Sequence, residues 1–424
     1  MKKLLFLGTG KGTIEMIKTA RRKGIYTIVT DFSSPEKSLG KMFSDEYWMI
    51  STSNLNELEQ KCRKEHINGV VTGVSEFNLE MNMELCKRLD LPCYCTPEAW
   101  RFSRNKYDFK QLCKRNHVRM AEDYPMSNPP TEAEIARVQF PVVVKAVDLS
   151  SNRGMSYCFT QEDLVKACEY ARSLSKSETI ICERMLKGPE VSAVYVMAAG
   201  EVRLLSFCSM HHQPGEPKNC YCISTSESKY LRRFLEEENE EIKRVLRAVD
   251  CKEGFAWVEM IIDECDNHFY LLEMGYRLCG DEINIPLRTV ADFDVHEWII
   301  NYALGKKNTL AELPVDQEDY YSTCACVYSL WTNQTATIGA IEGVEDVLEN
   351  QEIYWDSLVR QGDTIGEHLL LGEFMFEAKD VDEMCDIIRM INEKVSIRNT
   401  SGEEMIIHYT DYEHLVRTSR GYAE

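Results

Sequence analysis

Apolar runs in the first part of the chain alternate with segments of helical periodicity. Strands are expected at Leu4–Leu7, Tyr26–Thr30, Gly69–Gly73 and Pro92–Cys95, and helices at Thr13–Lys23 and Ser75–Leu89. Strands that alternate with helices in this way are typical of a parallel sheet with right-handed crossover connections. The pattern therefore predicts an α/β domain at residues 1–103.

The pattern changes beyond the helical stretch Ala99–His117 and the proline-rich break Tyr124–Pro130. Short apolar strands are then expected at Pro141–Lys145, Thr179–Glu183, Glu190–Met197 and Val202–Ser209. Amphipathic periodicity predicts helices at Lys229–Val249, Val295–Leu304 and Asp380–Lys394. The polar stretch Gly305–Asn308 marks a boundary. We expect two further α+β units, at residues 104–308 and 309–424.

Two apolar runs between Gly254 and Met274 flank a short polar turn, which is the pattern of a β-hairpin. If the turn centres on Asp266, Glu259 and Glu273 lie opposite each other on one face. Like charges about 5 Å apart repel by on the order of 3 kcal/mol at an effective dielectric constant of about 20. A divalent cation that prefers oxygen ligands, such as Mg²⁺, would turn this repulsion into a binding site. A register shift of one residue, which would expose one glutamate to solvent, stays open.

The chain of 424 residues carries a net charge of −20 and 17 cysteines. Nucleic-acid binding needs basic patches, and the sequence has none, so a nucleic-acid partner is not expected. No apolar run reaches about 18 residues, which argues against a membrane span, and the apolar start Met1–Gly10 is too short for a signal peptide. The cysteines lack CxxC spacing and are expected to be buried, reduced thiols. These features predict a cytoplasmic protein.

A glycine-rich turn, Gly8–Gly12, follows the first predicted strand and opens the first helix. Backbone N–H groups at such a helix start can hold phosphate, and Asp31 at the end of the next strand could bind a ribose. This combination would suit an NAD(P)-dependent oxidoreductase. However, Thr13 stands where the dinucleotide fingerprint has its third glycine, and the P-loop spacing fails as well. We therefore favour a Rossmann-like domain that binds no dinucleotide.

Lys145 ends a predicted strand and is followed by the polar loop Asp148–Met155. A lysine in this place directs a positive charge at whatever the loop encloses, and the loop offers hydroxyl and backbone N–H donors for phosphate oxygens. Further along, the strand Thr179–Glu183 turns into a loop whose backbone could read the edge of an adenine. Glu190, seven residues beyond Glu183, could accept hydrogen bonds from ribose hydroxyls.

The order of these elements is more specific than any one of them. A lysine at a helix start, a strand-end lysine with its loop, a glutamate hinge and the paired glutamates follow one another along the chain. The segments concerned are Lys106, Pro141–Met155, Cys182–Glu190 and Gly254–Ile283. This order resembles the ATP-grasp superfamily, and within it the carboxylate–amine ligases of the L-amino acid ligase and carbamoyl-phosphate synthase large-subunit type.

The resemblance implies an α/β and α+β multidomain fold. A Rossmann-like pre-ATP-grasp domain would occupy residues 1–103, and an ATP-grasp domain of two α+β subdomains would occupy residues 104–308, with a small lid at about 139–190. Residues 309–424 would form a C-terminal α+β cap. The resemblance also implies ATP and Mg²⁺, with Mn²⁺ as an alternative metal, and it allows a homodimer.

It further implies a role for each matching residue. Lys106 and Lys145 would contact the phosphates and adenine of ATP, and Glu259 and Glu273 would ligate Mg²⁺. Arg277 would meet the carboxylate substrate and the acyl phosphate made from it. The other nucleotide contacts would come from the phosphate loop Ser150, Ser151, Asn152 and Gly154, from Glu183 and the backbone of Arg184, Met185 and Leu186 at the adenine, and from Glu190 at the ribose.

The resulting hypothesis is a ligase that phosphorylates a small carboxylate with ATP and couples the acyl phosphate to an amine, releasing ADP and phosphate. Neither nucleic acid nor a membrane is an expected partner. Gly275 stands where the family has an asparagine ligand, so one metal ion is expected rather than two. The same departure motivates an alternative, a nucleotide-binding protein without catalysis. His211 and His212 are expected to lie in an exposed loop near the substrate, as solvated side chains.

Overall fold

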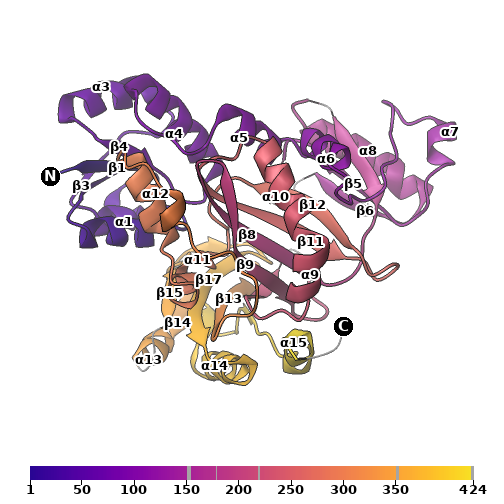
Figure 1. Ribbon diagram of the computed structural model, residues 1–424. Coiled ribbons are helices and arrows are strands. Elements are labelled where there is room, and N and C mark those ends of the chain that lie inside the picture. Colours follow the sequence, from indigo (N-terminus) through magenta and orange to yellow (C-terminus); the bar gives the residue numbers. More distant parts are fainter. Residues whose placement is uncertain (150–153, 178, 218–219, 350–352, 422–424) are drawn as a thin grey trace.

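The computed structural model describes residues 1–149, 154–177, 179–217, 220–349 and 353–421. It combines a parallel sheet, two small three-stranded sheets and a long antiparallel sheet (Figure 1). Three residues of the expected phosphate loop, Ser150, Ser151 and Asn152, lie outside the described ranges.

The N-terminal region is a parallel sheet with the strand order β3-β2-β1-β4, as the alternating pattern predicts. Its elements are β1 (Lys3–Leu7), α1 (Thr13–Arg22), β2 (Tyr26–Thr30), η1 (Pro35–Lys37), α2 (Gly40–Phe43), β3 (Glu46–Trp48), α3 (Leu55–Glu65), β4 (Gly69–Val71) and α4 (Glu76–Leu89). Helix α12 (Val295–Ala303) comes from much later in the chain and packs against α1 and β4 (Figure 1). Gly69 is required there, because a side chain would collide with the carbonyl of Ala303.

Helices α5 (Pro97–Arg104), α6 (Lys106–Arg115) and α7 (Glu132–Ile135) connect this region to a small antiparallel sheet, which we call the lid. The lid has the order β6-β5-β7 and consists of β5 (Val142–Ala146), β6 (Met155–Cys158) and β7 (Ile180–Arg184), covered by α8 (Gln161–Leu174). Asn105 caps α6, because its side chain accepts the N–H groups of Tyr107 and Asp108. This cap fixes Lys106 as the first residue of the helix.

The remaining strands form a nine-stranded sheet with the order β12-β11-β8-β9-β10-β13-β17-β15, and β19 also pairs with β13. The strands are β8 (Glu190–Ala198), β9 (Glu201–His212), β10 (Tyr221–Thr225), β11 (Gly254–Ile262), β12 (Phe269–Gly275), β13 (Cys324–Thr332), β15 (Tyr354–Ser357), β17 (Leu370–Ala378) and β19 (Ile406–Ile407). All residues of β8 are buried, so this strand runs through the centre of the core. Because β10 pairs with β13, the sheet continues across the predicted boundary at residue 308.

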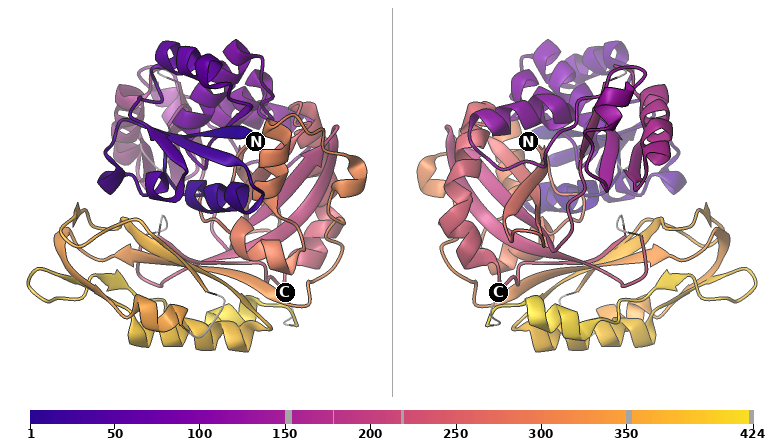
Figure 2. Two further views of the ribbon diagram at one scale, coloured as in Figure 1. Left: turned by 90° about the vertical axis from the view of Figure 1, so that its left-hand side faces the viewer. Right: turned by 90° about the vertical axis from the view of Figure 1, so that its right-hand side faces the viewer.

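Helices α9 (Leu231–Glu237), α10 (Asn239–Ala248) and α11 (Asn284–Val290) and the 3-10 turn η2 (Leu310–Glu312) connect the strands of this sheet. A second small sheet has the order β16-β14-β18, from β14 (Ala336–Glu342), β16 (Thr364–Ile365) and β18 (Ser396–Asn399). The C-terminal helices are α13 (Val344–Leu348), α14 (Val381–Lys394) and α15 (Tyr412–Thr418). Figure 2 shows these helices, in orange and yellow, along the outer side of the C-terminal strands.

Several sequence expectations are wrong in detail. Pro92–Cys95 is not a strand. Each of the two long predicted helices is divided, into α5 and α6 around the capping residue Asn105 and into α9 and α10 at Glu238. The described part of the C-terminal region contains three α-helices rather than one. Periodicity alone marks the helical stretches but not the caps that interrupt them.

The state of the cysteines agrees with the expectation of buried, reduced thiols. All 17 cysteines are free thiols, and only Cys93 and Cys265 are not buried. Among the described residues, no helix has both the length and the apolar character needed to cross a bilayer.

Candidate active site

The hairpin β11–β12 places Glu259 directly opposite Glu273, as predicted. Nearer the turn the register shifts, because Met260 pairs with Leu271. Leu272 is therefore the extra residue of a β-bulge, and this bulge brings the two glutamates into register. The predicted cross-strand pair is confirmed, while the bulge that produces it was not foreseen.

The two carboxyl groups of the pair differ in charge. Burial, with the nearby Glu273 and Glu190, raises the pKa of Glu259 to about 8. Burial also acts on Glu273, but Lys106, whose Nζ is 2.9 Å from Glu273 Oε2, and Lys145 hold the pKa of Glu273 below its usual value. The pair therefore carries one negative charge near neutral pH, and the repulsion is relieved by a proton.

Two carboxylates opposite each other suit a hard cation such as Mg²⁺, which also takes oxygen ligands from phosphates and water. No group of three or more His, Cys, Asp or Glu side chains within the described ranges could hold a metal by itself. The donor set thus fits a metal that arrives with a phosphate ligand.

Gly275 adjoins this pair and has a steric explanation. A side chain at residue 275 would overlap the indole ring of Trp257, which lies opposite on β11. The large aromatic ring therefore takes the space in which an asparagine ligand would stand. Trp257 thus accounts for the glycine, and the expectation of one metal ion rather than two stays a prediction.

A cavity of about 150 Å³ lies under the lid, and we call it the lid cavity. It brings together the predicted residues Lys106, Lys145, Glu183, Arg184, Met185, Leu186, Glu190, Glu259 and Glu273. Tyr157 and Tyr221 also line it, and sequence reasoning missed both. Gly154, in a left-handed conformation at φ 70°, does not line this cavity.

Glu183 is buried and held by two lysines. Lys145 Nζ is 2.5 Å from Glu183 Oε1, and Lys110 forms an ion pair with Oε2 and a second one with Asp123. Despite burial, these two lysines keep the pKa of Glu183 below its usual value. Both oxygens of the Glu183 carboxylate therefore form ion pairs, one with Lys145 and one with Lys110. Sequence reasoning missed Lys110, although it lies one helical turn after Lys106 on α6.

Glu190 begins β8 and accepts a hydrogen bond from the hydroxyl of Tyr221. The ring of His212 packs on Tyr221, and His212 Nε2 is 3.6 Å from Glu190 Oε2. The prediction that His211 and His212 lie in an exposed loop is wrong, because β9 extends to His212 and pairs with β10. His211 is buried, and burial lowers its pKa to about 3.

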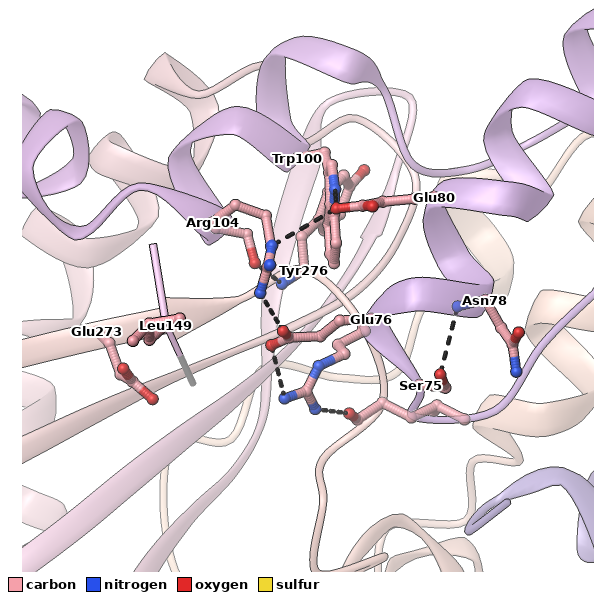
Figure 3. A network of polar contacts seen from close by, with 12 residues as sticks. Ser75, Glu76, Asn78, Glu80, Trp100, Arg104, Leu149, Glu273 and Tyr276 are labelled. Atoms are coloured by element: carbon pink, nitrogen blue, oxygen red, sulfur yellow. Dashed lines mark hydrogen bonds and ion pairs between the residues drawn. The ribbon is translucent and has the colours of Figure 1, made fainter. Parts of the chain in front are cut away.

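Arg277 follows β12 and is held from several sides. Its Nη1 donates to the carbonyl of Leu278 at 2.9 Å, and its guanidinium lies 5.1 Å from the centre of the Trp257 ring. Its Nη2 is 3.4 Å from Glu76 Oε1, and Glu76 in turn forms an ion pair with Arg104 (Figure 3). Glu76 and Arg104 come from α4 and α5, and sequence reasoning missed both.

Two further cavities adjoin the hairpin. The polar cavity, about 310 Å³, lies between the hairpin and helices α4 and α5 and includes Glu76, Arg104 and Lys106 in its lining. The aromatic cavity, about 300 Å³, lies between the hairpin and strands β10, β13 and β17 and includes Tyr221 and Trp331. Glu273 lines both of them and the lid cavity as well.

The glycine-rich turn Gly8–Gly12 makes contacts inside the protein. Lys11 Nζ is 2.5 Å from Glu373 Oε2 of β17 and also donates to the carbonyl of Gly280. Asp31 accepts the N–H of Ser33 and pairs with Lys41 at 2.8 Å. The carboxylate of Asp31, which a dinucleotide would need for its ribose, is thus engaged within the protein, and this does not favour the oxidoreductase alternative.

Comparisons with known proteins agree with this geometry. Residues 105–307 match the family model "Carbamoyl-phosphate synthase L chain, ATP binding domain". A formate-dependent phosphoribosylglycinamide formyltransferase from Bacteroides thetaiotaomicron is 22% identical over 94% of this chain and 100% of its own length. An L-amino acid ligase structure from Bacillus licheniformis superposes with a TM-score of 0.75 at 17% identity and covers 94% of this chain and 99% of its own.

A biotin carboxylase from Campylobacter jejuni, solved as a β,γ-ATP complex, has a TM-score of 0.76 at 16% identity. It covers 98% of this chain and 95% of its own. The fold therefore matches along essentially the whole chain, and the family model covers the lid, the hinge and the hairpin. With the ordered lysines, hinge and paired glutamates in one site, residues 105–307 are a carbamoyl-phosphate synthase L chain ATP-binding domain of the ATP-grasp superfamily.

Proposed function

We propose that this protein is an ATP- and Mg²⁺-dependent ligase that activates a carboxylate as an acyl phosphate and couples it to an amine. ATP would occupy the lid cavity, with its phosphates near Lys106 and Lys145 and its adenine at the hinge Arg184–Leu186. The phosphate loop at 150–154 and Glu190 would complete the nucleotide contacts. Mg²⁺ held by Glu259 and Glu273 would neutralise charge on the phosphates.

The reaction follows from the weakness of a carboxylate as an electrophile. A carboxylate oxygen attacks the γ-phosphorus, and the bond from this phosphorus to ADP breaks. The amine nitrogen then attacks the acyl carbon, the carbon–oxygen bond to phosphate breaks, and the amine loses a proton. The protein positions these groups and supplies cations, with Arg277 beside the acyl phosphate.

One observation carries this proposal: Glu273 lines the lid cavity and both neighbouring cavities. A phosphate that reaches Glu273 from the lid cavity could therefore be approached by one molecule in each of the two other cavities. Two substrates that must meet at one phosphorus and one carbon need such a junction. An ATP site without catalysis would need only the lid cavity.

The test is product release from the purified full chain with ATP and Mg²⁺. ADP and phosphate are expected in equal amounts, and only when a suitable acid and an amine are both present. Panels of amino acids and dipeptides would serve as both substrates. ATP binding without turnover in any combination would favour the alternative, a nucleotide-binding protein that has lost catalysis.

Binding of Mg²⁺ with ADP at about pH 7 is expected to release about one proton, because Glu259, with a pKa of about 8, must ionise to ligate the metal. Since the folded protein holds this proton at neutral pH, affinity should rise with pH, by up to about tenfold per unit, and level off above about pH 8. Calorimetry in two buffers with different ionisation enthalpies measures the released proton.

Glu259→Gln removes this titratable group, and proton release should then disappear. Glu264→Gln, in the exposed turn of the same hairpin, is the matched control and should behave like the original protein. Metal-dependent binding with no proton release at neutral pH would show that Glu259 is not a ligand.

A further inference from the structure

The polar cavity and the aromatic cavity share one wall, formed by Trp257, Glu273 and Arg277. Both therefore reach the place where the phosphate, the metal ligand and the arginine meet. A molecule in either cavity has access to the same reacting group. What distinguishes the two cavities is the chemistry of their other walls.

The two cavities have opposite charge. Three cations, Arg104, Lys106 and Arg277, face two carboxylates in the polar cavity, and little of its surface is apolar. In the aromatic cavity only Lys11 and Arg277 are cationic, against four carboxyl groups: Glu259, Glu273, Asp281 and Glu373. Tyr221 and Trp331 add aromatic faces, which attract ammonium groups. An anion is favoured in the first cavity and a cation in the second.

Glu76 fixes the geometry of the two arginines that line the polar cavity. Its two oxygens contact Arg277 and Arg104 separately, so one carboxylate is shared between two guanidinium groups (Figure 3). Arg104 Nε also lies 3.5 Å from Glu80 Oε1, outside the cavity lining, so the charge of Arg104 is shared with a second carboxylate and Arg277 is the arginine left to meet an anionic ligand. Arg277 Nε is buried and has no hydrogen-bond partner within the described ranges, so this donor remains available.

We propose that the polar cavity holds the carboxylate substrate, that the aromatic cavity holds the amine, and that Glu76 is a positioning residue for Arg277 and Arg104. The inference rests on the proposed ligase function and specifies its substrates. The acid is short and hydrophilic, because the polar cavity offers little apolar surface to a longer chain. The amine carries an apolar or aromatic body, because the aromatic cavity does offer such surface.

This assignment of the two substrates to the two cavities sets the side from which each reacting atom approaches. The carboxylate oxygen attacks the γ-phosphorus from the polar cavity, and ADP leaves toward the lid cavity. The amine nitrogen approaches the acyl carbon from the aromatic cavity and expels phosphate. Bound as an ammonium ion, the amine first gives one proton to a carboxylate of the aromatic cavity, which frees its lone pair for the attack. It loses a second proton, which the released phosphate can accept, once the carbon–nitrogen bond has formed. Glu76, on the N-terminal helix α4, thereby links the first domain to the chemistry.

The experiment uses hydroxylamine, a small acceptor that converts an acyl phosphate to a hydroxamate. The full chain, ATP and Mg²⁺ are combined with glycine, L-serine, acetate or hexanoate, and hydroxamate and ADP are measured. Benzylamine, added as a competing acceptor, reports on the amine side because it lowers the hydroxamate yield. Glycine or L-serine is expected to support hydroxamate formation, and hexanoate is not.

Glu76→Gln and Arg104→Gln are each expected to raise KM for the acid about tenfold, with a smaller change in kcat, since a charged contact is lost. Glu373→Gln should instead raise the benzylamine concentration for half-maximal competition about tenfold. Glu84→Gln, on the same helix α4 and paired only with Arg88 among the described residues, is the matched control and should leave both values unchanged.

The outcomes distinguish the proposed ligase function from the assignment of the two substrates to the two cavities. If no acid yields hydroxamate and ADP, the proposed function fails, and the division of the substrates fails with it. If hydroxamate forms but Glu76→Gln and Arg104→Gln leave KM for the acid within about twofold, the division alone is wrong. Interchanged effects, with Glu373→Gln acting on the acid and Glu76→Gln on benzylamine, would also overturn it, as would hexanoate used as well as glycine.

Discussion

Glu273→Gln is expected to lower ATP turnover by on the order of 10²–10³-fold, the usual effect of losing one preorganised electrostatic contact in a reaction centre. The substitution keeps the shape of the side chain and removes its charge. A neutral amide is a poor Mg²⁺ ligand, and Lys106, 2.9 Å away, loses its ionic partner. Glu273 lines all three of these cavities, whereas Glu259 lines only two of them.

The measurement is turnover as a function of Mg²⁺ concentration, together with the affinity for ADP with and without the metal. Glu273→Gln should weaken the metal-dependent part of ADP binding and leave the metal-independent part nearly unchanged. Mn²⁺, which accepts similar ligands, should restore only part of the rate. Glu264→Gln in the exposed turn serves as the control. Normal turnover with an unchanged Mg²⁺ requirement would show that the metal site lies elsewhere.

Local patterns in the sequence were enough to predict the hairpin, the lysine near the end of a strand, and the strand that turns into the hinge. Alternating apolar residues around a polar turn predict the pairing of Glu259 with Glu273, and the structure has that pair. The bulge at Leu272 could not be predicted, because alternation along each strand does not show where one strand carries an extra residue. From the sequence alone, the two glutamates were expected to repel each other. In the structure Lys106 pairs with Glu273, and a proton on Glu259 removes the second negative charge.

The residues that were missed are joined to the site only by the tertiary fold. Glu76 meets Arg277 across 201 positions of sequence, and Tyr221 reaches Glu190 across 31. His211 was misplaced for a similar reason, because it is buried by the pairing of β9 with β10. The predicted boundary at 308 is crossed by one continuous sheet. The position of this boundary stays a prediction. The composition of the sequence could not show that the sheet continues across it, because continuity depends on which strands pair.

Lys110→Met is expected to lower the free energy of unfolding by about 3–5 kcal/mol, the usual effect of removing one partner from a buried ion pair. Lys110 is 2% exposed and pairs with both Glu183 and Asp123. Methionine fills a similar space, so the change is largely electrostatic. Glu183 would remain buried with Lys145 as its one cationic partner among the described residues. We also expect weaker ATP binding, because Lys145 would follow the displaced carboxylate.

Two further variants separate charge from packing. Lys114→Met removes a half-exposed lysine that pairs only with Asp123 among the described residues, and it should change stability by less than about 1 kcal/mol. Lys110→Met combined with Glu183→Gln removes both buried charges of the pair and should be more stable than Lys110→Met alone, since no unpaired carboxylate is left in the interior. Urea unfolding, followed by tryptophan fluorescence, measures all of these variants. If Lys110→Met and Lys114→Met lowered the free energy of unfolding equally, the buried ion pairs of Lys110 would not stabilise the hinge.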